Sequence, residues 1–420
     1  MTRTDKPRHT VVVGGGIIGI STSIWLLRAG HRVTLIDRGD AVRRASFGNA
    51  GILAACSIAP VTMPGLIRTA LTHTFDPDYP LFLRKRYLPR LAPWLARYLS
   101  HCTALEAARI SRALAPLLRD TVMQHRALAQ DTDAARWIKD SDYLFAYPSR
   151  ASFEQDRAAW RLRQAAGFVW QEFDGQAVRL LDPAFGPSIG YGVLVPDHGI
   201  IVDPGRYLDD LNGHAAALGA ILLRSEARGF RCARDGSLQA VIHDAGVLEA
   251  DHAVIATGAW SKGLVLPLGL KVPLESERGY HLMLRETSQA PRFPTMIAAG
   301  KFAATPMANG VRCAGIIEFG GLEAPAQRKP IDLIARKLRE AFPAFTFGHY
   351  EEWLGHRPAP SDSLPLIGPV PGHRGIYLAF GHHHIGMTSG PKTGRLLAAM
   401  ITGASPELDM APYSPSRFAR

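Results

Sequence analysis

The chain begins with an alternation of apolar runs and helical periodicity. Val11–Val13 form an apolar run, and apolar residues then recur at helical spacing at Ile20, Ile24 and Leu27. A second apolar run follows at Arg32–Ile36. This order predicts a strand, a helix and a parallel strand, which is the first unit of a doubly wound α/β sheet.

The alternation is lost between about Pro60 and Leu194, where helical patterns dominate. Leu105–Leu128 and Ser152–Ala166 have the spacing of amphipathic helices. This region is therefore expected to belong to a second lobe inserted into the first.

A stretch of mixed basic and apolar residues, Leu81–Leu99, lies inside that region. Two explanations stay open for it: a face at a membrane interface, or the flank of the second lobe. Pro89 and Pro93 should break it into short pieces, which favours packing within the fold.

Strand and helix patterns return after the interruption. Ile200–Asp203 reads as a strand, with Asp203 as the N-cap and Pro204 in the first turn of a helix. A further strand is expected at Ala220–Leu223, and an apolar run ends in Thr-Gly at Ala253–Gly258. The doubly wound lobe is therefore predicted to be discontinuous in sequence.

The last third of the chain is rich in strand patterns. Its expected elements are the strands Leu274–Leu284, Val311–Phe319 and Glu351–Leu354, the helix Ile331–Phe342, and a closing helix Pro391–Ile401.

The first turn carries a glycine pattern with specific chemistry. Gly14, Gly16 and Gly19 satisfy G-x-G-x-x-G between a strand and a helix. These glycines allow a tight turn, a close approach to a pyrophosphate and close helix packing, and the helix N-terminus attracts phosphate. Asp37 ends the next strand, where a carboxylate that binds ribose is expected. The pattern predicts a dinucleotide site for FAD or NAD rather than NADP.

Composition limits the class of protein. The 420 residues suffice for two lobes or more, and 47% hydrophobic with 20% charged residues is ordinary for a globular protein. The formal charge of +11 comes from arginines scattered along the chain. This charge leaves open an arginine-rich composition without special function, a membrane surface or nucleic acid, and the scatter favours the first.

Four widely spaced cysteines form no C-x-x-C pair, which argues against zinc and predicts a reducing compartment. We expect no signal peptide and no membrane-spanning helix.

Four blocks occur together and in order. They are Gly14–Gly19, Val254–Gly258, Gly355–Pro358 with Asp362–Gly368, and Gly381–Gly390. On these blocks the chain resembles the FAD-dependent D-amino-acid oxidase superfamily. Further stretches resemble its bacterial D-amino-acid dehydrogenase branch: Ala45–Gly51, Glu277–His281, Glu318–Gly321 and Pro412–Phe418.

The resemblance implies a Rossmann-like FAD-binding domain and a mixed-sheet substrate domain, an α/β and α+β architecture. Residues 1–60, 195–262 and 350–420 are expected to form the FAD domain, and residues 61–194 and 263–349 the substrate domain.

The resemblance also implies which residues hold noncovalent FAD. On that basis Arg44, Ser46 and Asn49 would line the flavin side, Ala227 would meet adenine, and the N-terminus of the last helix would face the flavin. The full expected set is Gly14, Gly16, Ile17, Ile18, Gly19, Asp37, Arg38, Arg44, Ser46, Asn49, Ala50, Gly51, Ala227, Thr257, Gly258, His384, Ile385, Gly386, Met387 and Thr388.

An amino-acid substrate presents a carboxylate, which a guanidinium fork binds best. Arg357 matches the family's carboxylate-binding arginine. Tyr280 and His281 are similar to positions facing the flavin, although a buried pair serving only the sheet is the alternative. Arg278 is either a second carboxylate contact or the ion-pair partner of Glu277.

The triplet His382–His384 does not have metal-ligand spacing, so no metal is expected. One of the three, taken here as His384, is expected to contact substrate. The triplet departs from the family's usual Gly-His-Gly-His pattern, so the resemblance does not define the shape of the pocket here.

The activity that the resemblance implies is oxidative deamination of a D-amino acid, including a D-proline or D-hydroxyproline type, by hydride transfer to flavin N5. Electrons would pass to a quinone or another carrier. An oxidase of the same superfamily that uses O2 is the first alternative. A flavin domain acting on tRNA and a nonenzymatic regulatory protein are the others.

The expected partners are an amino-acid substrate and an electron acceptor, with no nucleic acid. The expected location is the cytoplasm, and a peripheral contact with the inner face of the membrane stays open.

Overall fold

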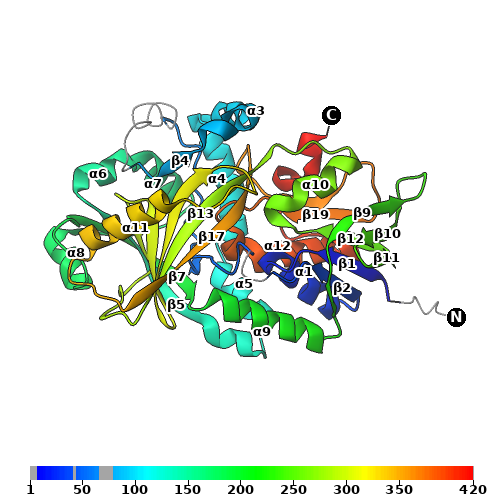
Figure 1. The fold of residues 1–420 in the computed structure, drawn as a ribbon, viewed down its shortest axis with the longest axis horizontal. Coiled ribbons are helices and arrows are strands. Elements are labelled where there is room, and N and C mark those ends of the chain that lie inside the picture. The colour runs from blue at the N-terminus through cyan, green and yellow to red at the C-terminus, as the bar shows by residue number, and fades with distance from the viewer. Residues whose placement is uncertain (1–6, 41–43, 66–78, 420) are drawn as a thin grey trace.

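Two sheets, one in each half of the molecule, organise the fold (Figure 1). The computed structural model describes residues 7–40, 44–65 and 79–419. The smaller sheet lies in the half that holds both ends of the chain, and the larger sheet lies in the other half.

The smaller sheet confirms the predicted doubly wound pattern. Within the described residues its strand order is β18 (Leu366–Pro369), β19 (Ile376–Phe380), β12 (His252–Ile255), β1 (His9–Val13), β2 (Arg32–Asp37) and β8 (Ile221–Arg224). All neighbouring pairs are parallel except β18 with β19. Helix α1 (Ile17–Arg28) connects the parallel strands β1 and β2.

Alternation along β1 divides the core of this half in two. Val12 points to one face, where it joins a cluster with helices α1 (Ile17–Arg28), α9 (Pro204–Ala217) and α12 (Gly386–Thr402). Val11 and Val13 point to the other face. That face is covered by a separate three-stranded sheet made of β11 (Gly246–Glu249), β10 (Leu238–His243) and β9 (Ala227–Cys232). The strand is apolar on both sides because both faces are buried.

The larger sheet is mixed. Its order is β17 (His349–Pro360), β13 (Leu274–Arg285), β16 (Gly310–Phe319), β15 (Phe302–Met307), β14 (Thr295–Ile297), β5 (Ile138–Tyr147), β7 (Tyr191–Ile201) and β3 (Ile52–Leu53). Two further strands pair beside this path, β4 (Leu81–Leu83) with β16 and β6 (Gln171–Asp174) with β7.

The remaining helices cover these sheets. They are α3 (Leu88–Ser100), α4 (Ala104–Leu118), α5 (Thr121–Leu128), α6 (Arg150–Gln155), α7 (Arg157–Ala165), α8 (Gly175–Leu181), α10 (Ser261–Val265) and α11 (Arg328–Ala341). Short 3-10 turns are η2 (Lys85–Tyr87), η3 (Asp133–Trp137), η4 (Gly258–Trp260), η5 (Leu266–Leu268), η6 (Ala411–Tyr413) and η7 (Pro415–Phe418).

Several predicted element boundaries are corrected. The stretch predicted as one helix from Leu105 forms α4 and α5, and the stretch from Ser152 forms α6 and α7. The closing helix begins at Gly386, so Pro391 lies inside it. The N-cap prediction is confirmed, because Asp203 Oδ1 accepts a hydrogen bond from the Arg206 N–H at 3.1 Å.

Pro93 does not end the helix that contains it, contrary to the prediction. The buried stripe of Leu91, Trp94 and Tyr98 holds α3 against the protein and compensates for the hydrogen bond that proline removes. Trp94 Nε1 donates to the Ala359 carbonyl at 3.0 Å. The aromatic face of this basic stretch therefore packs within the fold.

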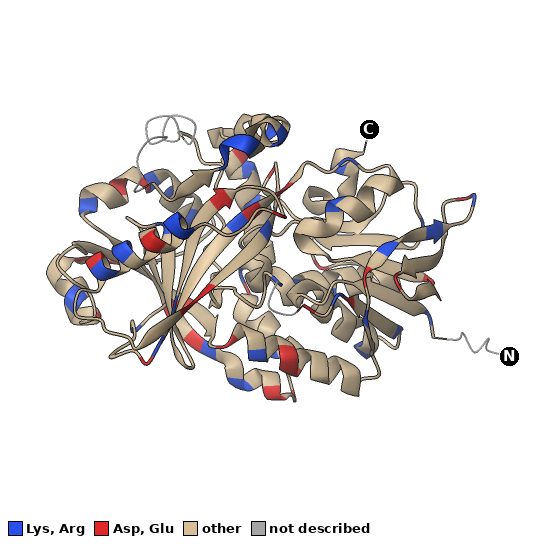
Figure 2. Ribbon diagram, viewed as in Figure 1, with Lys and Arg blue, Asp and Glu red and all other residues tan. Residues whose placement is uncertain are grey.

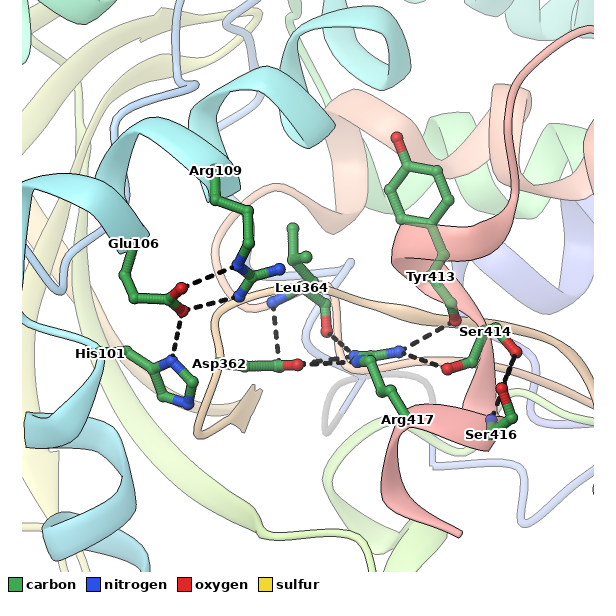
Figure 3. Close-up of polar contacts among 9 residues, drawn as sticks. All are labelled: His101, Glu106, Arg109, Asp362, Leu364, Tyr413, Ser414, Ser416 and Arg417. Carbon is green, nitrogen blue, oxygen red and sulfur yellow. Dashed lines mark hydrogen bonds and ion pairs between the residues drawn. The ribbon is translucent and has the colours of Figure 1, made fainter.

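The C-terminal segment is fixed to the loop that follows β17 (Figure 3). Arg417 Nε donates to Asp362 Oδ2 at 2.7 Å, and Arg417 Nη2 donates to the Leu364 carbonyl at 2.7 Å. Nearby on α4, Glu106 pairs with Arg109 and His101. These bonds secure the end of β17, the strand that carries Arg357.

The two sheets interleave along the chain more than the expected boundaries imply. β3 and most of β17 join the larger sheet from within ranges expected to form the FAD domain, and β7 crosses residue 195. Residues 1–6, 41–43, 66–78 and 420 lie outside the described residues. The domain division at the stated boundaries stays a prediction.

Positive charge is spread over the molecule rather than gathered into a patch in the view of Figure 2, where basic and acidic segments are interspersed in both halves. Across residues 7–40, 44–65 and 79–419, every helix is too short or too polar to cross a bilayer.

Candidate active site

A cavity of about 510 Å³ lies where the two halves meet. Its wall includes the turn after β1, the end of β2, the start of α12, and residues of β5, β13, β16 and β17. A volume of this size suits a cofactor or small-molecule site.

The first turn forms a backbone cradle at one end of this cavity. Gly14 has φ +112°, and a Cβ there would lie 2.5 Å from the Ala256 carbonyl oxygen. A Cβ on Gly19 would lie 1.9 Å from the Gly14 carbonyl oxygen, so helix α1 can approach β1 only without it. Gly16 is the N-cap and provides no side-chain cap. The first N–H groups of α1 are therefore available to a phosphate, apart from the Ile17 N–H, which Ser46 Oγ accepts at 3.1 Å.

Asp37 lies beside this cradle at the end of β2. Its Oδ2 accepts from the Gly15 N–H at 2.6 Å, and its Oδ1 pairs with Arg44 Nη2 at 2.8 Å. Burial acts to raise the pKa of Asp37, but Arg44 and the backbone donors lower it below its usual value. The carboxylate is therefore ionised and lines the cavity, where it can accept hydrogen bonds from sugar hydroxyls.

Arg44 lines this end of the cavity, where it pairs with Asp37, and its expected position beside the flavin stays a prediction. Asn49 Oδ1 accepts from the Gly51 N–H at 2.8 Å, which stabilises the loop around Ala50. Along the wall beyond Asp37, the Arg38 guanidinium lies 4.7 Å from the Trp260 ring centroid. Ala227, Thr257 and Gly258 also line the cavity.

The N-terminus of α12 forms another part of the wall. His384, Gly386, Met387 and Thr388 line the cavity, whereas Ile385 is buried in the core. The His384 side chain is exposed to the cavity, and desolvation by the surrounding protein together with the neighbouring His383 lowers its pKa below the usual value. His384 is therefore neutral at pH 7, and the first N–H groups of α12 are free of partners within the helix.

Three side chains from different elements meet in the substrate-domain part of the cavity. Arg357 on β17 lies directly opposite Glu277 on β13, and its Nη1 donates to Glu277 Oε1 at 2.8 Å. His383, before α12, bonds through Nε2 to Glu277 Oε2. All three line the cavity, and Glu277 is only 2% exposed. The sequence analysis identified Arg357 as a site residue but did not place Glu277 and His383 beside it.

Glu277 is ionised in this arrangement. Burial acts to raise its pKa, but His383 and Arg357 lower it well below the usual range. The carboxylate orients the guanidinium, and Arg357 Nη2 also donates to the Gly315 carbonyl at 3.4 Å. The Arg357 side chain is 23% exposed and lines the cavity, so the arrangement can bind a carboxylate through the exposed part of Arg357.

Arg278 lies neither on the cavity wall, as a contact for the substrate carboxylate would, nor beside Glu277. It points to the opposite face of β13 from Glu277, because successive residues of a strand alternate. There its Nε lies 3.4 Å from Glu318 Oε2, and its Nη2 donates to the Ala324 and Pro325 carbonyls. The expected ion pair between Arg278 and Glu277 is therefore wrong, and Arg278 is fully buried in a structural network.

Tyr280 and His281 likewise have structural partners. The Tyr280 hydroxyl donates to Glu318 Oε2 at 2.5 Å, although Tyr280 also contributes to the cavity wall. The His281 ring stacks on Trp353 with centroids 4.9 Å apart, and its Nδ1 bonds to the Gly48 carbonyl at 2.9 Å. His281 is outside the cavity wall. The two side chains lie on opposite faces of β13 and do not form a pair.

Alternation along β13 was the signal that could have found Glu277. It places Glu277 and Gly279 on one face and Arg278 and Tyr280 on the other. Among the described residues, no three His, Cys, Asp or Glu side chains are grouped in a way that could hold a metal ion.

The family model described as FAD dependent oxidoreductase (DAO) matches residues 9–400. The chain belongs to this family, so it is an FAD-dependent oxidoreductase with FAD as its cofactor, and the fold and family expected from the sequence are confirmed. The glycine cradle, the uncapped start of α1 and the ionised Asp37 fit the phosphates and ribose of that cofactor.

Similar proteins extend the comparison along the whole chain. A D-amino-acid oxidase of Bradyrhizobium diazoefficiens is 38% identical over 418 residues, which cover 98% of this chain and 99% of that protein. A D-amino acid dehydrogenase of Methylobacterium nodulans is 30% identical and covers 98% and 99% of the two chains. The solved L-amino acid deaminase from Proteus vulgaris has a TM-score of 0.74 at 16% identity, covering 100% and 99%, and shares the fold.

Proposed function

We propose that the protein oxidises the Cα–N bond of a D-amino acid and passes the electrons to a quinone or another carrier. The observation that carries this proposal is Arg357, a partly exposed guanidinium on the cavity wall that is held by buried Glu277. The names of the relatives at 38% and 30% identity support an amino-acid substrate of D configuration.

Most of the residues that would hold FAD line the cavity, whereas Gly19 and Gly51 lie behind its wall. The turn at Gly14–Gly16 and the first turn of α1 would hold the pyrophosphate through N–H groups such as those of Gly16 and Ile18, because the Gly14 and Ile17 N–H groups donate to Ile36 and Ser46. Asp37 would bind the ribose. Ala227 would lie against adenine. Ser46, Asn49, Ala50, Gly51 and the start of α12 would line the flavin. A bound flavin supplies an acceptor for the hydride that leaves the substrate Cα.

The protein's own groups orient and protect the substrate. Arg357 would hold the carboxylate, which fixes the position of Cα and supplies the advantage of orientation. His384, neutral at pH 7, would contact the substrate without repelling its amine. The N–H groups of Met387 and Thr388 would provide a positive potential where negative charge develops.

Loss of the Asp37 carboxylate should weaken FAD binding. For Asp37→Ala we expect the dissociation constant of FAD to rise about 10- to 100-fold, the effect of losing hydrogen bonds to a charged group. Flavin fluorescence released on dilution measures this constant. Asp235→Ala, an exposed acid on the turn after β9, is the control and should leave it unchanged. Unchanged FAD affinity in Asp37→Ala would exclude the ribose role.

Anaerobic mixing of the yellow holoenzyme with single amino acids tests the substrate class. We expect D-amino acids to bleach the flavin absorbance and their L-enantiomers to leave this absorbance unchanged. The panel includes D-proline and both hydroxyproline epimers, which would give cyclic imines. If D-amino acids leave the colour unchanged, the proposal fails.

An oxidase is the second candidate function, because the relative at 38% identity is named a D-amino-acid oxidase. Readmitting air to the bleached enzyme distinguishes the two. Rapid return of colour with one peroxide per turnover supports the oxidase, whereas slow return with rapid reduction of an added quinone or dye supports the carrier.

A further inference from the structure

A second guanidinium faces the cavity from the larger sheet's side. Arg163 on α7 is 8% exposed and contributes to the cavity wall. Its Nε donates to the Cys56 carbonyl at 3.1 Å, just after β3. This residue belongs to none of the expected binding sets, because nothing in the sequence of α7 distinguishes it from neighbouring arginines.

The terminal nitrogens of Arg163 lack a carboxylate partner. Among the described residues, no carboxylate lies within ion-pair distance of the guanidinium, whose polar neighbours there are the carbonyl and the thiol of Cys56. These nitrogens are not sealed in the core, so they remain accessible from the cavity. Lys301, another cation on this wall, differs in that it lies 3.9 Å from Asp156.

Aromatic rings hold Arg163 in place. Its guanidinium carbon lies 4.5 Å from the Trp160 ring centroid and 5.0 Å from that of Phe145. Trp160 is in turn fixed by a hydrogen bond from Nε1 to the Tyr147 hydroxyl at 3.0 Å. A cation fixed by two rings and one carbonyl has little rotational freedom to lose when it binds an anion.

Tyr143 adds a second donor on the same wall. It is 3% exposed, its ring centroid lies 4.6 Å from that of Phe145, and it lines the cavity. Among the described residues its hydroxyl makes no hydrogen bond, yet it is not sealed from the cavity. Burial raises its pKa, so the hydroxyl stays protonated and can donate.

The charge of Arg163 contrasts with that of Arg357. Arg357 has Glu277 as its buried counter-ion, whereas Arg163 has none. An unpaired buried cation is costly, and a bound anion would offset that cost. An amino acid whose side chain is also a carboxylate supplies two anions, one for each arginine.

We propose that Arg163 and Tyr143 bind an anionic group on the substrate side chain, so that the preferred substrates are the acidic amino acids aspartate and glutamate. This inference rests on the proposed function, because it assigns the α-carboxylate to Arg357. A carboxylate at Arg163 would accept hydrogen bonds from the terminal nitrogens of the guanidinium and from the Tyr143 hydroxyl.

Isosteric substrate pairs test the inference. For the wild-type holoenzyme we expect kcat/KM to be about 100-fold higher for D-glutamate than for D-glutamine, or for D-aspartate than for D-asparagine. Arg163→Gln should remove this preference by lowering kcat/KM for the acids about 100-fold while the amides change less than about threefold. Arg163→Lys should keep part of the preference, and Tyr143→Phe should lose part of it.

A matched control is available on the same helix. Arg161 is exposed two residues earlier, and Arg161→Gln makes the same change of charge without touching the cavity. It should leave every kinetic constant unchanged. If the wild-type enzyme has the same kcat/KM for an acidic substrate and for its amide, the inference is overturned. Equal loss for all substrates in Arg163→Gln would overturn it too, because Arg163 would then hold the α-carboxylate or only the fold.

A binding measurement separates this inference from the proposed function. Succinate and malonate should perturb the flavin absorbance of the wild-type holoenzyme at concentrations at least tenfold below propionate, and Arg163→Gln or Arg163→Lys should reduce that difference. If no amino acid bleaches the flavin but dicarboxylates still bind through Arg163, the proposed reaction fails and the anion site stands. If dicarboxylates and propionate bind alike, the anion site fails.

Discussion

Replacing Arg357 with alanine is expected to lower kcat/KM for amino-acid substrates by about 10³-fold, mostly through a higher KM. The change removes a charge-assisted fork that would hold the substrate carboxylate. It also leaves Glu277, 2% exposed, with its negative charge beside the cavity. Truncating one partner of a buried, hydrogen-bonded charge pair, here Arg357 with the substrate carboxylate, costs about 2–5 kcal/mol. A loss of about 10³-fold in affinity lies within this range.

Steady-state kinetics with the best D-amino acid measures this effect, and flavin content and the melting temperature show whether the variant folds. Arg285→Ala is the matched control, because Arg285 pairs with Glu351 between the same two strands but away from the cavity. Arg357→Lys should recover part of the affinity but not the fork geometry. Near-normal kinetics in Arg357→Ala would remove Arg357 from the substrate site.

Replacing Glu277 with glutamine is expected to lower the free energy of unfolding at pH 7 by about 3–5 kcal/mol, because Arg357 loses its buried counter-ion. The KM should also rise, since the amide no longer fixes the guanidinium. Glu351→Gln removes an acid that is exposed and pairs with Arg285 on the same strands, so it should cost less than about 1 kcal/mol.

The stability effect of Glu277 should depend on pH in a defined direction. The pKa of Glu277 in the folded protein lies well below its unfolded value of 4.5, since His383 and Arg357 outweigh burial. The stabilisation is therefore complete above about pH 5 and is lost as the pH falls below the unfolded value. Denaturant unfolding of wild type and Glu277→Gln should converge as the pH falls from 6 to 3. A difference that stays constant over this range would contradict the ionised role of Glu277.

The local parts of the fold could be predicted from the sequence because their causes are local. The strand, glycine turn and helix around Gly14–Gly19 depend on short-range sterics and on apolar spacing. The same holds for the cap at Asp203. Asp37 was found because its distance along the chain from the glycines is a property of one βαβ unit.

Helix ends were less accessible to sequence reasoning. Pro93 lies inside α3 because burial of Trp94 and Tyr98 stabilises the helix more than the missing hydrogen bond destabilises it. That burial depends on Phe319 and Ala359, which are distant in sequence. The proline pattern alone could not reveal such neighbours.

The sequence by itself determined the class of the cofactor domain and pointed to Arg357, because both signals are short motifs that are contiguous in the chain. Tertiary structure decided the ion pairs. Glu277 and Arg357 lie 80 residues apart, and they meet only because β13 and β17 pair in one register. Strand alternation then sends Arg278 into the core, and α7 places Arg163 on the cavity wall. The partner of each charged side chain depends on the face of the strand from which it points and on the register in which the strands pair. Both are fixed only when the sheets form and pack.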